Sequence, residues 1–181
     1  MPRVATAPVD AFPPIVGRSP QLLILGSLPG VRSLAAGEYY AHPRNAFWPI
    51  MGELFGAWPS LPYAGRRAAL ISARVAVWDV LAQAQRPGSA DASIDAPSAV
   101  ANRFDQFLAE HRSIVCIAFN GTMAAALYRR KVLAQLPAAL GAIRQRTLPS
   151  TSAAHASLDI AAKLQHWMVL KQELTTAATT E

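Results

Sequence analysis

Short unbroken runs of apolar residues recur along the chain and are separated by longer segments of helical periodicity. The runs at 22–25, 75–78 and 114–119 are apolar at every position, and a more polar run at 144–148 ends before a turn-forming Pro-Ser pair. A short continuous apolar run is typical of a strand that is buried on both faces, as in a parallel sheet. We therefore predict four strands at these positions.

Four other segments carry apolar residues at helical spacing. They lie at 47–54, 100–108, 123–132 and 152–168. Gly56 is a stop signal for the first helix, and Ser152 is a residue type that caps helix N-termini, so the last helix is expected to begin there. Strands that alternate with helices predict βαβ units and an α/β layered domain with a mostly parallel sheet.

The distribution of prolines and the chain length indicate how the protein is organised. Residues 1–20 hold five of the 14 prolines and are expected to form an irregular N-terminal arm. Residues 21–175 are expected to form a single domain, because 181 residues is close to the usual length of one domain. The stretch 85–97, rich in Gly, Ser, Asp and Pro, is interpreted as a surface loop.

The charge balance favours an anionic partner. Lys and Arg number 17 against 11 Asp and Glu, which gives a formal net charge of +6 and a pI of about 10.1. Nucleic acid is the first candidate for such a partner, and the alternative is an Ala- and Arg-rich composition without functional meaning. With 52% apolar and 15% charged residues, the chain does not have the composition of a disordered or coiled-coil protein.

The sequence predicts no metal, no cofactor and no membrane association. The single Cys116 excludes a disulfide framework, an iron–sulfur cluster and a Cys-based zinc site within the chain, and the four histidines show no metal-ligand spacing. No apolar run approaches the roughly 18 residues of a transmembrane helix, and the N-terminus lacks a signal-peptide pattern. A cytoplasmic location is therefore expected.

Small, polar or turn-forming residues follow each predicted strand. These segments read GSLPG at 26–30, WDV at 78–80, FNG at 119–121 and LPSTS at 148–152. Each alone could be an ordinary strand-to-helix turn. In an open parallel sheet, however, ligands bind outside the carboxyl ends of the strands, so the four segments together predict a binding site.

A dense polar and aromatic cluster, GEYYAHPRNAFW at 37–48, precedes the first predicted helix. Aromatic rings stack on nucleobases, arginine binds phosphate, and asparagine offers both a donor and an acceptor. The alternative is that Tyr39 and Tyr40 cover the edge of the sheet and that Asn45 caps the helix. The concentration of these residue types favours a nucleic-acid site.

The segments GSLPG and YYAHPRNAFW together resemble the uracil-DNA glycosylase superfamily, and most closely its hypoxanthine-DNA glycosylase branch, which is related to the mismatch-specific uracil-DNA glycosylases. The segment LPSTSAAH at 148–155 is similar to the second motif of the superfamily, and the order of elements fits from Leu22 to about Trp167. The resemblance implies a three-layer α/β/α fold with a central, mostly parallel four-stranded sheet. It also implies a DNA glycosylase of base excision repair that acts as a monomer on double-stranded DNA containing a damaged or mismatched base.

Two departures from the family pattern bear on the base that is excised. Leu28 stands where uracil-excising enzymes carry an Asp or Asn that positions water, and Leu148 stands where the second motif usually begins with a His. The hypoxanthine branch relies instead on the Asn of its HPxN segment, which is Asn45 here. The resemblance therefore implies hypoxanthine (deoxyinosine) as the base and Asn45 as the catalytic residue that orients the attacking water.

The remaining site residues receive roles in base or DNA binding. Tyr40 takes the place of the stacking aromatic in the mismatch-specific relatives, and Asp79 is either a reader of the hypoxanthine N1–H group or a turn cap. His155, expected in the first turn of the last helix, faces either the site or solvent, and Asn120 either contacts the base or turns the chain. The predicted base-binding residues are Gly26, Ser27, Leu28, Pro29, Gly30, Tyr40, Asp79 and Asn120, with backbone amides of the 27–30 loop facing the base's carbonyl oxygen. The predicted DNA-binding residues are Arg44, Ser150, Thr151, Ser152 and His155, with the phosphates at the start of the last helix.

Three alternatives remain at this stage. The nearest keeps the fold and predicts a uracil or mismatch-specific glycosylase. A second is a DNA-binding module without catalysis, and a third is a hydrolase or transferase that uses His155 or Ser152. Because none of Lys131, Lys163 and Lys171 is expected near the loops, a monofunctional glycosylase without Schiff-base chemistry is predicted.

Overall fold

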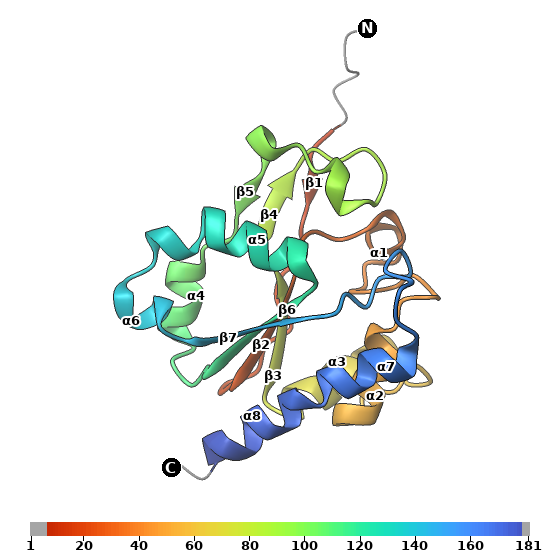
Figure 1. The fold of residues 1–181 in the computed structure, drawn as a ribbon, viewed down its shortest axis with the longest axis vertical. Helices are drawn as coiled ribbons and strands as arrows, with labels where there is room; N and C mark the ends of the chain where they lie inside the picture. The colour runs from red at the N-terminus through yellow and green to blue at the C-terminus, as the bar shows by residue number, and fades with distance from the viewer. Residues whose placement is uncertain (1–6, 179–181) are drawn as a thin grey trace, which may run out of the picture.

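Four parallel strands form the centre of the fold in the computed structural model, which describes residues 7–178 (Figure 1). The sheet runs in the order β3-β2-β6-β7. The strands are β2 (Leu22–Gly26), β3 (Val75–Asp79), β6 (Cys116–Asn120) and β7 (Arg144–Leu148). All neighbours in this sheet pair in parallel, which confirms the predicted four-stranded sheet. The polar sequence of β7 follows from its place at the sheet edge, where three of its five side chains are exposed.

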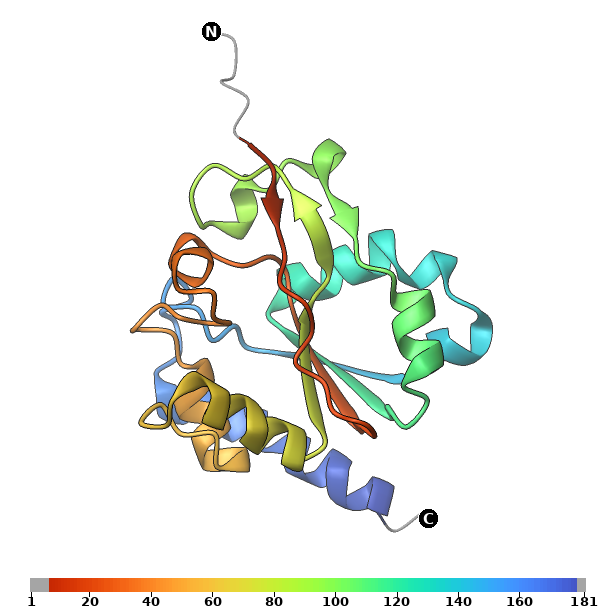
Figure 2. The same ribbon diagram turned by 180° about the vertical axis from the view of Figure 1, so that it is seen from behind.

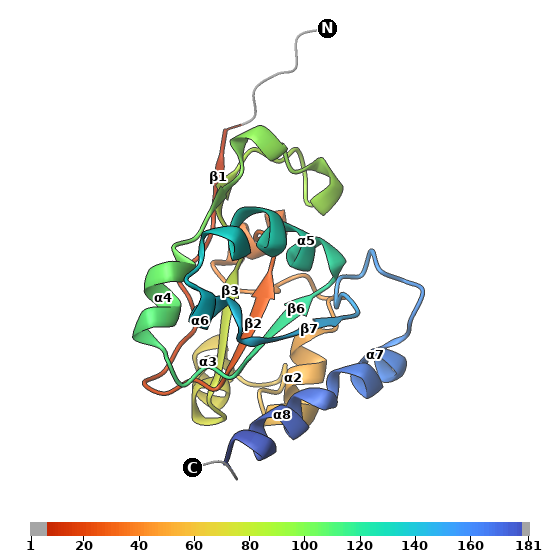
Figure 3. The ribbon, with the colours of Figure 1, turned by 60° about the vertical axis from the view of Figure 1, so that its left-hand side comes forward.

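Two helical layers cover the sheet, and the side chains of β2 alternate between them (Figures 1 and 3). Leu22 and Ile24 belong to one hydrophobic core, and Leu23 and Leu25 to the other. The first core is closed by α2 (Phe47–Phe55), α3 (Tyr63–Ser72), α7 (Ile160–Trp167) and α8 (Val169–Ala178). The second is closed by α4 (Phe104–Glu110), α5 (Thr122–Lys131) and α6 (Ala138–Gly141). The three-layer α/β/α class is therefore confirmed.

A second, antiparallel sheet lies beyond the carboxyl end of β3 and was not predicted. It consists of β1 (Val9–Asp10), β4 (Leu81–Ala84) and β5 (Val100–Ala101), in the order β1-β4-β5. The helix predicted over 100–108 is consequently shorter, and only α4 is helical. Asn102 separates the two elements, because its backbone N–H bonds to the carbonyl oxygen of Val80 and its side chain donates to that of Asp79.

The segment expected to form an irregular arm packs against the domain where the structure describes it. Residues 1–6 lie outside the described residues, and the rest is irregular apart from β1. Ile15 is buried and forms an antiparallel bridge with Val77, so the segment runs along β3 (Figure 2). The division of the chain into an arm at 1–20 and a domain at 21–175 stays a prediction.

The last helical segment begins later than the sequence pattern indicates. The helix expected from Ser152 starts at Ile160, where Oδ1 of Asp159 accepts from the Ala162 N–H at 2.8 Å and caps it. Upstream, the Ser150 and Ser152 hydroxyls accept from backbone N–H groups two residues ahead, and such local turns compete with helix formation. Residues 149–159 therefore form a loop.

Four helices, α1 (Val31–Ala36), α3, α6 and α8, were not predicted, and the predicted helices at 47–54 and 123–132 are confirmed as α2 and α5. α2 ends at Gly56, which takes the left-handed conformation at φ 74°, and α5 begins directly after Gly121. Three short 3-10 helices, at Asp91–Ser93, Ala96–Ser98 and Leu133–Gln135, complete the described elements. Within residues 7–178, no helix has both the length and the apolar character needed to cross a membrane.

Candidate functional site

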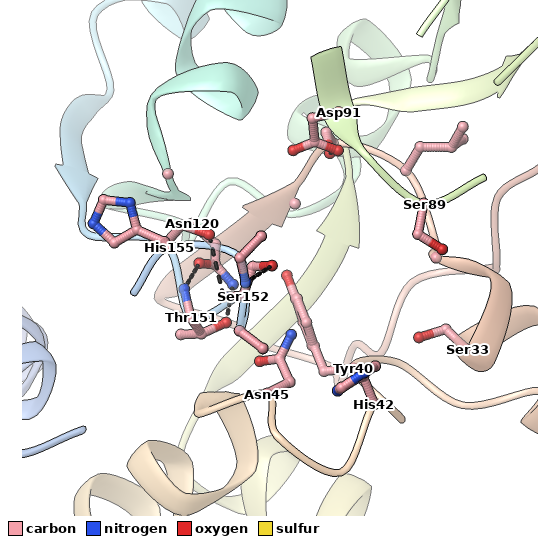
Figure 4. A pocket seen from close by; sticks show the side chains of 18 of the residues that line it. Ser33, Tyr40, His42, Asn45, Ser89, Asp91, Asn120, Thr151, Ser152 and His155 are labelled. Atoms are coloured by element: carbon pink, nitrogen blue, oxygen red, sulfur yellow. Dashed lines mark hydrogen bonds between the residues drawn. The ribbon is translucent and has the colours of Figure 1, made fainter. Parts of the chain in front are cut away.

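An open cavity of about 730 Å³ lies at the carboxyl ends of β2, β3 and β6 (Figure 4). Its walls come from the loop after β2, the segment before α2, the segment at 89–92 and the loop after β7. A volume of this size can hold a nucleotide-sized ligand. The lining includes every residue that the sequence predicted for the site, namely Gly26, Ser27, Leu28, Pro29, Gly30, Tyr40, Arg44, Asn45, Asp79, Asn120, Ser150, Thr151, Ser152 and His155.

Two oxygen atoms on the cavity floor are buried without a partner. Oδ2 of Asp79 and the hydroxyl of Tyr40 have no hydrogen bond within the described part of the chain, although the Asp79 residue is only 3% exposed. Both side chains crowd Gly26: a Cβ atom there would lie 2.5 Å from Oδ1 of Asp79 and 2.8 Å from the Tyr40 hydroxyl. Because buried polar groups in proteins are almost always paired, these two atoms are available for hydrogen bonds with a ligand or a water molecule.

The burial of these two groups changes their acidity. Burial and the nearby Asp91 carboxylate raise the pKa of Asp79 and the Arg86 guanidinium lowers it, and the net result is a pKa of about 7. Burial and the charge of Asp79 also raise the pKa of Tyr40. The Tyr40 hydroxyl therefore stays protonated and able to donate, whereas Asp79 changes its charge near neutral pH.

The ring of Tyr40 is held rigidly in the cavity. Its backbone lies in the left-handed region at φ 55°, and its ring stacks on Phe47 with the centroids 3.9 Å apart and the planes 22° apart. A non-glycine residue in that conformation is uncommon and is found more often at functional sites. Phe47 thus covers one face of the Tyr40 ring.

Asn45 lines the cavity, and its side chain also bonds to the first residue of α2. Its Oδ1 accepts from the Phe47 N–H at 2.9 Å, which fixes the orientation of the amide. The next residue, Ala46, donates its N–H to the carbonyl oxygen of Thr151 at 2.9 Å. A carbonyl oxygen has two lone pairs, so Oδ1 of Asn45 can accept a second hydrogen bond from a water molecule.

Asn120 fastens the end of β6 to the loop after β7. Its Oδ1 accepts from the Thr151 N–H and its Nδ2 donates to the Thr151 hydroxyl, each at 2.8 Å (Figure 4). The following Gly121 has φ 98°, and a Cβ there would lie 3.1 Å from Cβ of Ser150. Only glycine allows this close approach of the two loops.

The predicted DNA-binding residues line the cavity, but Thr151 among them is fully buried, and the loop at 150–152 is not at a helix N-terminus. Ser150, Thr151 and Ser152 belong to the loop before α7, so the expected contribution of a helix dipole is wrong. His155 is exposed and its Nε2 lies 3.3 Å from the Ser157 hydroxyl. Arg44 is exposed at the rim.

Lys163 and Arg146 are both bonded to other parts of the chain and do not line the cavity. Lys163 was expected far from the loops, yet its buried amino group donates to the carbonyl oxygen of Ser152 at 3.2 Å. It lies behind this loop and does not line the cavity. Arg146 of β7 pairs with Glu173 of α8 at 2.8 Å.

The segment that follows β4 also lines the cavity, which its sequence did not indicate. Ser89 and Asp91 line the cavity, and the Ser27 hydroxyl donates to Oδ1 of Asp91 at 2.6 Å. Ser89 accepts from the Val31 N–H at 2.9 Å, and Arg86 lies behind the loop at 26–30. The segment had been interpreted as a surface loop, and its position soon after the carboxyl end of a strand was the one signal that could have placed it here.

Most of the chain matches a known protein family. Residues 13–171 match the family model described as the uracil DNA glycosylase superfamily. A solution NMR structure of a candidate uracil DNA glycosylase from Methanosarcina acetivorans is similar, with a TM-score of 0.76 and 27% sequence identity. The similarity covers 93% of this chain and 99% of that one. The predicted resemblance is confirmed.

Two curated relatives are each named "Hypoxanthine DNA glycosylase". The protein from Methanosarcina barkeri is 38% identical over 86 residues, which is 47% of this chain and 54% of the relative. The protein from Methanosarcina acetivorans is 34% identical over 84 residues, which is 46% of this chain and 53% of the relative. The chain thus spans about half the length of the curated relatives it matches.

Proposed function

The chain belongs to the uracil DNA glycosylase superfamily, and on this basis we propose that it is a monofunctional DNA glycosylase that removes a flipped-out deaminated base, with hypoxanthine as its main substrate. The observation that carries the proposal is the buried, unpartnered pair of Asp79 and Tyr40 on the cavity floor. The names of the two curated relatives support hypoxanthine as the base.

Asp79 is suited to distinguish hypoxanthine from adenine. Deamination replaces the amino group of adenine with a carbonyl and turns the adjacent ring nitrogen into an N–H donor. The ionised Asp79 carboxylate accepts from this N1–H, whereas adenine presents an acceptor there and would be repelled. The Tyr40 hydroxyl, next to this carboxylate, is a donor for the carbonyl oxygen, and the ring face that Phe47 does not cover supports the base.

The reaction is hydrolysis of the bond between C1′ of deoxyribose and the base. The bond electrons leave with the base, a water oxygen bonds to C1′, and the water's proton finally returns to the base or the solvent. Asn45 orients this water through the second lone pair of Oδ1. An amide is a poor base, so its contribution is position rather than proton abstraction.

The charge that builds up on the departing base needs donors close by. The backbone N–H groups of the loop at 26–30 border the cavity and are suited to this role. Fixed donors of this kind contribute about 3 kcal/mol each to a developing anion. In the described part of the chain no lysine lines the cavity, which supports a reaction that leaves an intact abasic site.

Double-stranded DNA with a damaged or mismatched base is the proposed partner, bound by one copy of the chain. Extrusion of a nucleotide costs a few kcal/mol and least at a weakened pair, such as inosine opposite thymine or cytosine. The exposed Arg44 and the partly exposed Ser150 and Ser152 line the cavity, where they can contact the phosphates flanking the extruded nucleotide.

The proposal is tested by incubating the protein with duplexes that contain deoxyinosine, deoxyuridine or normal bases, matched and mismatched, and by revealing abasic sites with alkali. We expect release of hypoxanthine, and a loss of about 10²-fold or more in the single-turnover rate of Asn45→Ala. The control Gln106→Ala, an exposed amide on α4, should keep the wild-type rate.

Other outcomes select the alternatives. Faster release of uracil than of hypoxanthine would assign the protein to the uracil-excising enzymes of the same fold. Salt-sensitive DNA binding without release of any base would contradict the glycosylase and identify a non-catalytic DNA-binding module.

A further inference from the structure

Arg86 lies behind the loop at 26–30 and is hydrogen-bonded to its backbone. Its side chain is 0% exposed, and its guanidinium donates to the carbonyl oxygens of Leu28 and Gly88, each at 3.1 Å, and to that of Pro29. Burial lowers the pKa of Arg86, and Asp91, whose carboxylate is 4.0 Å away, raises it. The buried, positively charged guanidinium thus donates its hydrogen bonds to backbone carbonyl oxygens.

The neighbouring carbonyl groups of this loop are held from the same side of the molecule. The Val80 N–H donates to the Gly26 carbonyl oxygen at 2.8 Å, and the Leu81 N–H donates to that of Ser27 at 3.1 Å. Four consecutive carbonyl groups, 26–29, therefore have donors from the β3–β4 connection or from Arg86.

The direction of the carbonyl groups fixes the direction of the N–H groups. Residues 7–178 contain no cis peptide bond, and in a trans peptide the N–H points opposite to the C=O. The N–H groups of Ser27, Leu28 and Gly30 are thus directed away from these donors, and Pro29 has none. None of the three has an acceptor within the described residues, and all three residues line the cavity.

Arg86 is the donor to the carbonyl groups of Leu28 and Pro29, and of these two peptides only the one between Pro29 and Gly30 carries an N–H. No backbone N–H bonds to the Pro29 carbonyl oxygen in the described chain, and glycine at position 30 tolerates the backbone angles that a reversed peptide would need. If this peptide reversed, a carbonyl oxygen would replace an N–H at the cavity and would repel negative charge on a departing base.

We propose that Arg86 is a positioning residue for base excision, whose guanidinium holds the carbonyl groups of Leu28 and Pro29 away from the cavity so that the loop presents N–H donors to the departing base. The inference rests on the proposed function and extends it to a residue outside the cavity. A guanidinium is suited to this task because its planar fork serves several acceptors at once, which an ammonium group cannot do in the same geometry.

The test compares wild type with Arg86→Lys and Arg86→Met in single-turnover excision from a deoxyinosine duplex. Arg74→Met is the matched control, because Nε of Arg74 also donates to a backbone carbonyl, that of Ser19 at 3.0 Å, but at the opposite end of β3. We expect a loss of about 10²-fold for Arg86→Met, a smaller loss for Arg86→Lys, and little change for Arg74→Met. Affinity for the same duplex, measured in an Asn45→Ala background, should stay within about twofold.

A second readout separates positioning from a general loss of structure. Xanthine departs as a more stable anion than hypoxanthine and needs less help from the loop, so the rate loss of Arg86→Met should be smaller on a deoxyxanthosine duplex. An equal loss on both bases together with weaker DNA binding, or a wild-type rate in Arg86→Met, would overturn the proposal.

Nuclear magnetic resonance keeps the inference independent of catalysis. In folded Arg86→Lys or Arg86→Met, the amide resonances of Ser27 and Gly30 should shift or broaden, while those of β7 stay in place. Absence of any base release by wild type would refute the proposed function, and unchanged loop amides in the variants would refute the role of Arg86. If Arg86→Met does not fold, the excision rate and the amide resonances are both measured on Arg86→Lys.

Discussion

The Asp79 carboxyl and the Tyr40 hydroxyl converge on one point of the cavity floor. A Cβ atom on Gly26 would lie 2.5 Å from Oδ1 of Asp79 and 2.8 Å from the Tyr40 hydroxyl oxygen. The two groups come from different parts of the chain, one from the end of β3 and the other from the segment before α2. If the base binds there as proposed, we expect its recognition to depend on the charge of Asp79 and on the free space at Gly26.

Hypoxanthine excision should depend on the ionisation of Asp79. Burial raises the pKa of this carboxyl to about 7, and only the ionised form accepts from N1–H. The single-turnover rate should therefore rise with pH through about 7, measured between about pH 5 and 9. Asp79→Asn should be slower and should lose this rise. A wild-type profile that is flat across this range would contradict the role of Asp79 as the reader.

The same carboxyl should lower the stability of the protein above neutral pH. An unfolded aspartate has a pKa of about 4, below the value of about 7 in the folded protein. The stability linked to Asp79 is thus fully present below about pH 4 and is lost as the pH rises through about 7. Asp79→Asn should therefore gain stability over wild type at about pH 8, by up to a few kcal/mol, and less at about pH 5. Urea unfolding at both pH values measures this, and a difference independent of pH would count against it.

Gly26→Ala should abolish excision with little effect on DNA affinity. The added methyl group collides with Asp79 and Tyr40, which must move from the cavity floor. Gly65→Ala in α3 is the control, because a Cβ there meets no atom nearer than 3.6 Å and alanine favours a helix. We expect Gly65→Ala to keep its rate and to unfold at a slightly higher temperature. Full activity of Gly26→Ala would show that the base does not bind at this point.

Asn120→Ala should destabilise the protein. Its amide makes two hydrogen bonds of 2.8 Å to Thr151, which is 0% exposed, so the variant leaves a buried N–H and a buried hydroxyl without partners. Such a loss costs about 2–4 kcal/mol for the two groups together. Denaturant unfolding measures the change, and the exposed amide of Gln106 serves for comparison, since its removal should cost less than about 0.5 kcal/mol. A similar small cost for Asn120→Ala would mean that the two loops hold together without it.

Borohydride should trap no covalent complex between the protein and DNA. Lys163 is the lysine to consider for Schiff-base chemistry. Burial lowers its pKa, and its amino group lies 3.2 Å from the Ser152 carbonyl oxygen. It lies behind the loop rather than in the cavity, so it cannot reach C1′. Lys163→Met should accordingly still release hypoxanthine. A trapped complex in wild type that disappears in Lys163→Met would replace the monofunctional mechanism with a lyase.

Local sequence pattern was a good guide to the parallel sheet and a poor one to the elements around it. Strands at 22–26, 75–79 and 116–120 were found because their mostly buried side chains form unbroken apolar runs, and β7 at 144–148 was found because a turn follows it. The last helix starts at Ile160 and not at Ser152. Asp159 caps it, whereas the serines of the preceding loop bond to backbone N–H groups within that loop. The small antiparallel sheet was missed because two of its strands have two residues each and carry no periodicity.

The sequence by itself determined the family, the layered fold and many of the residues that border the cavity, because strand ends and motif spacing are local properties of the chain. Only the tertiary structure decided the state of those residues. Packing removes the Asp79 carboxyl from water, which leaves its Oδ2 without a hydrogen bond and raises its pKa. The left-handed backbone conformation of Tyr40 accompanies the stacking of its ring on Phe47. Arg86 reaches the loop at 26–30 across 58 positions of sequence, and no local pattern records a contact of that range.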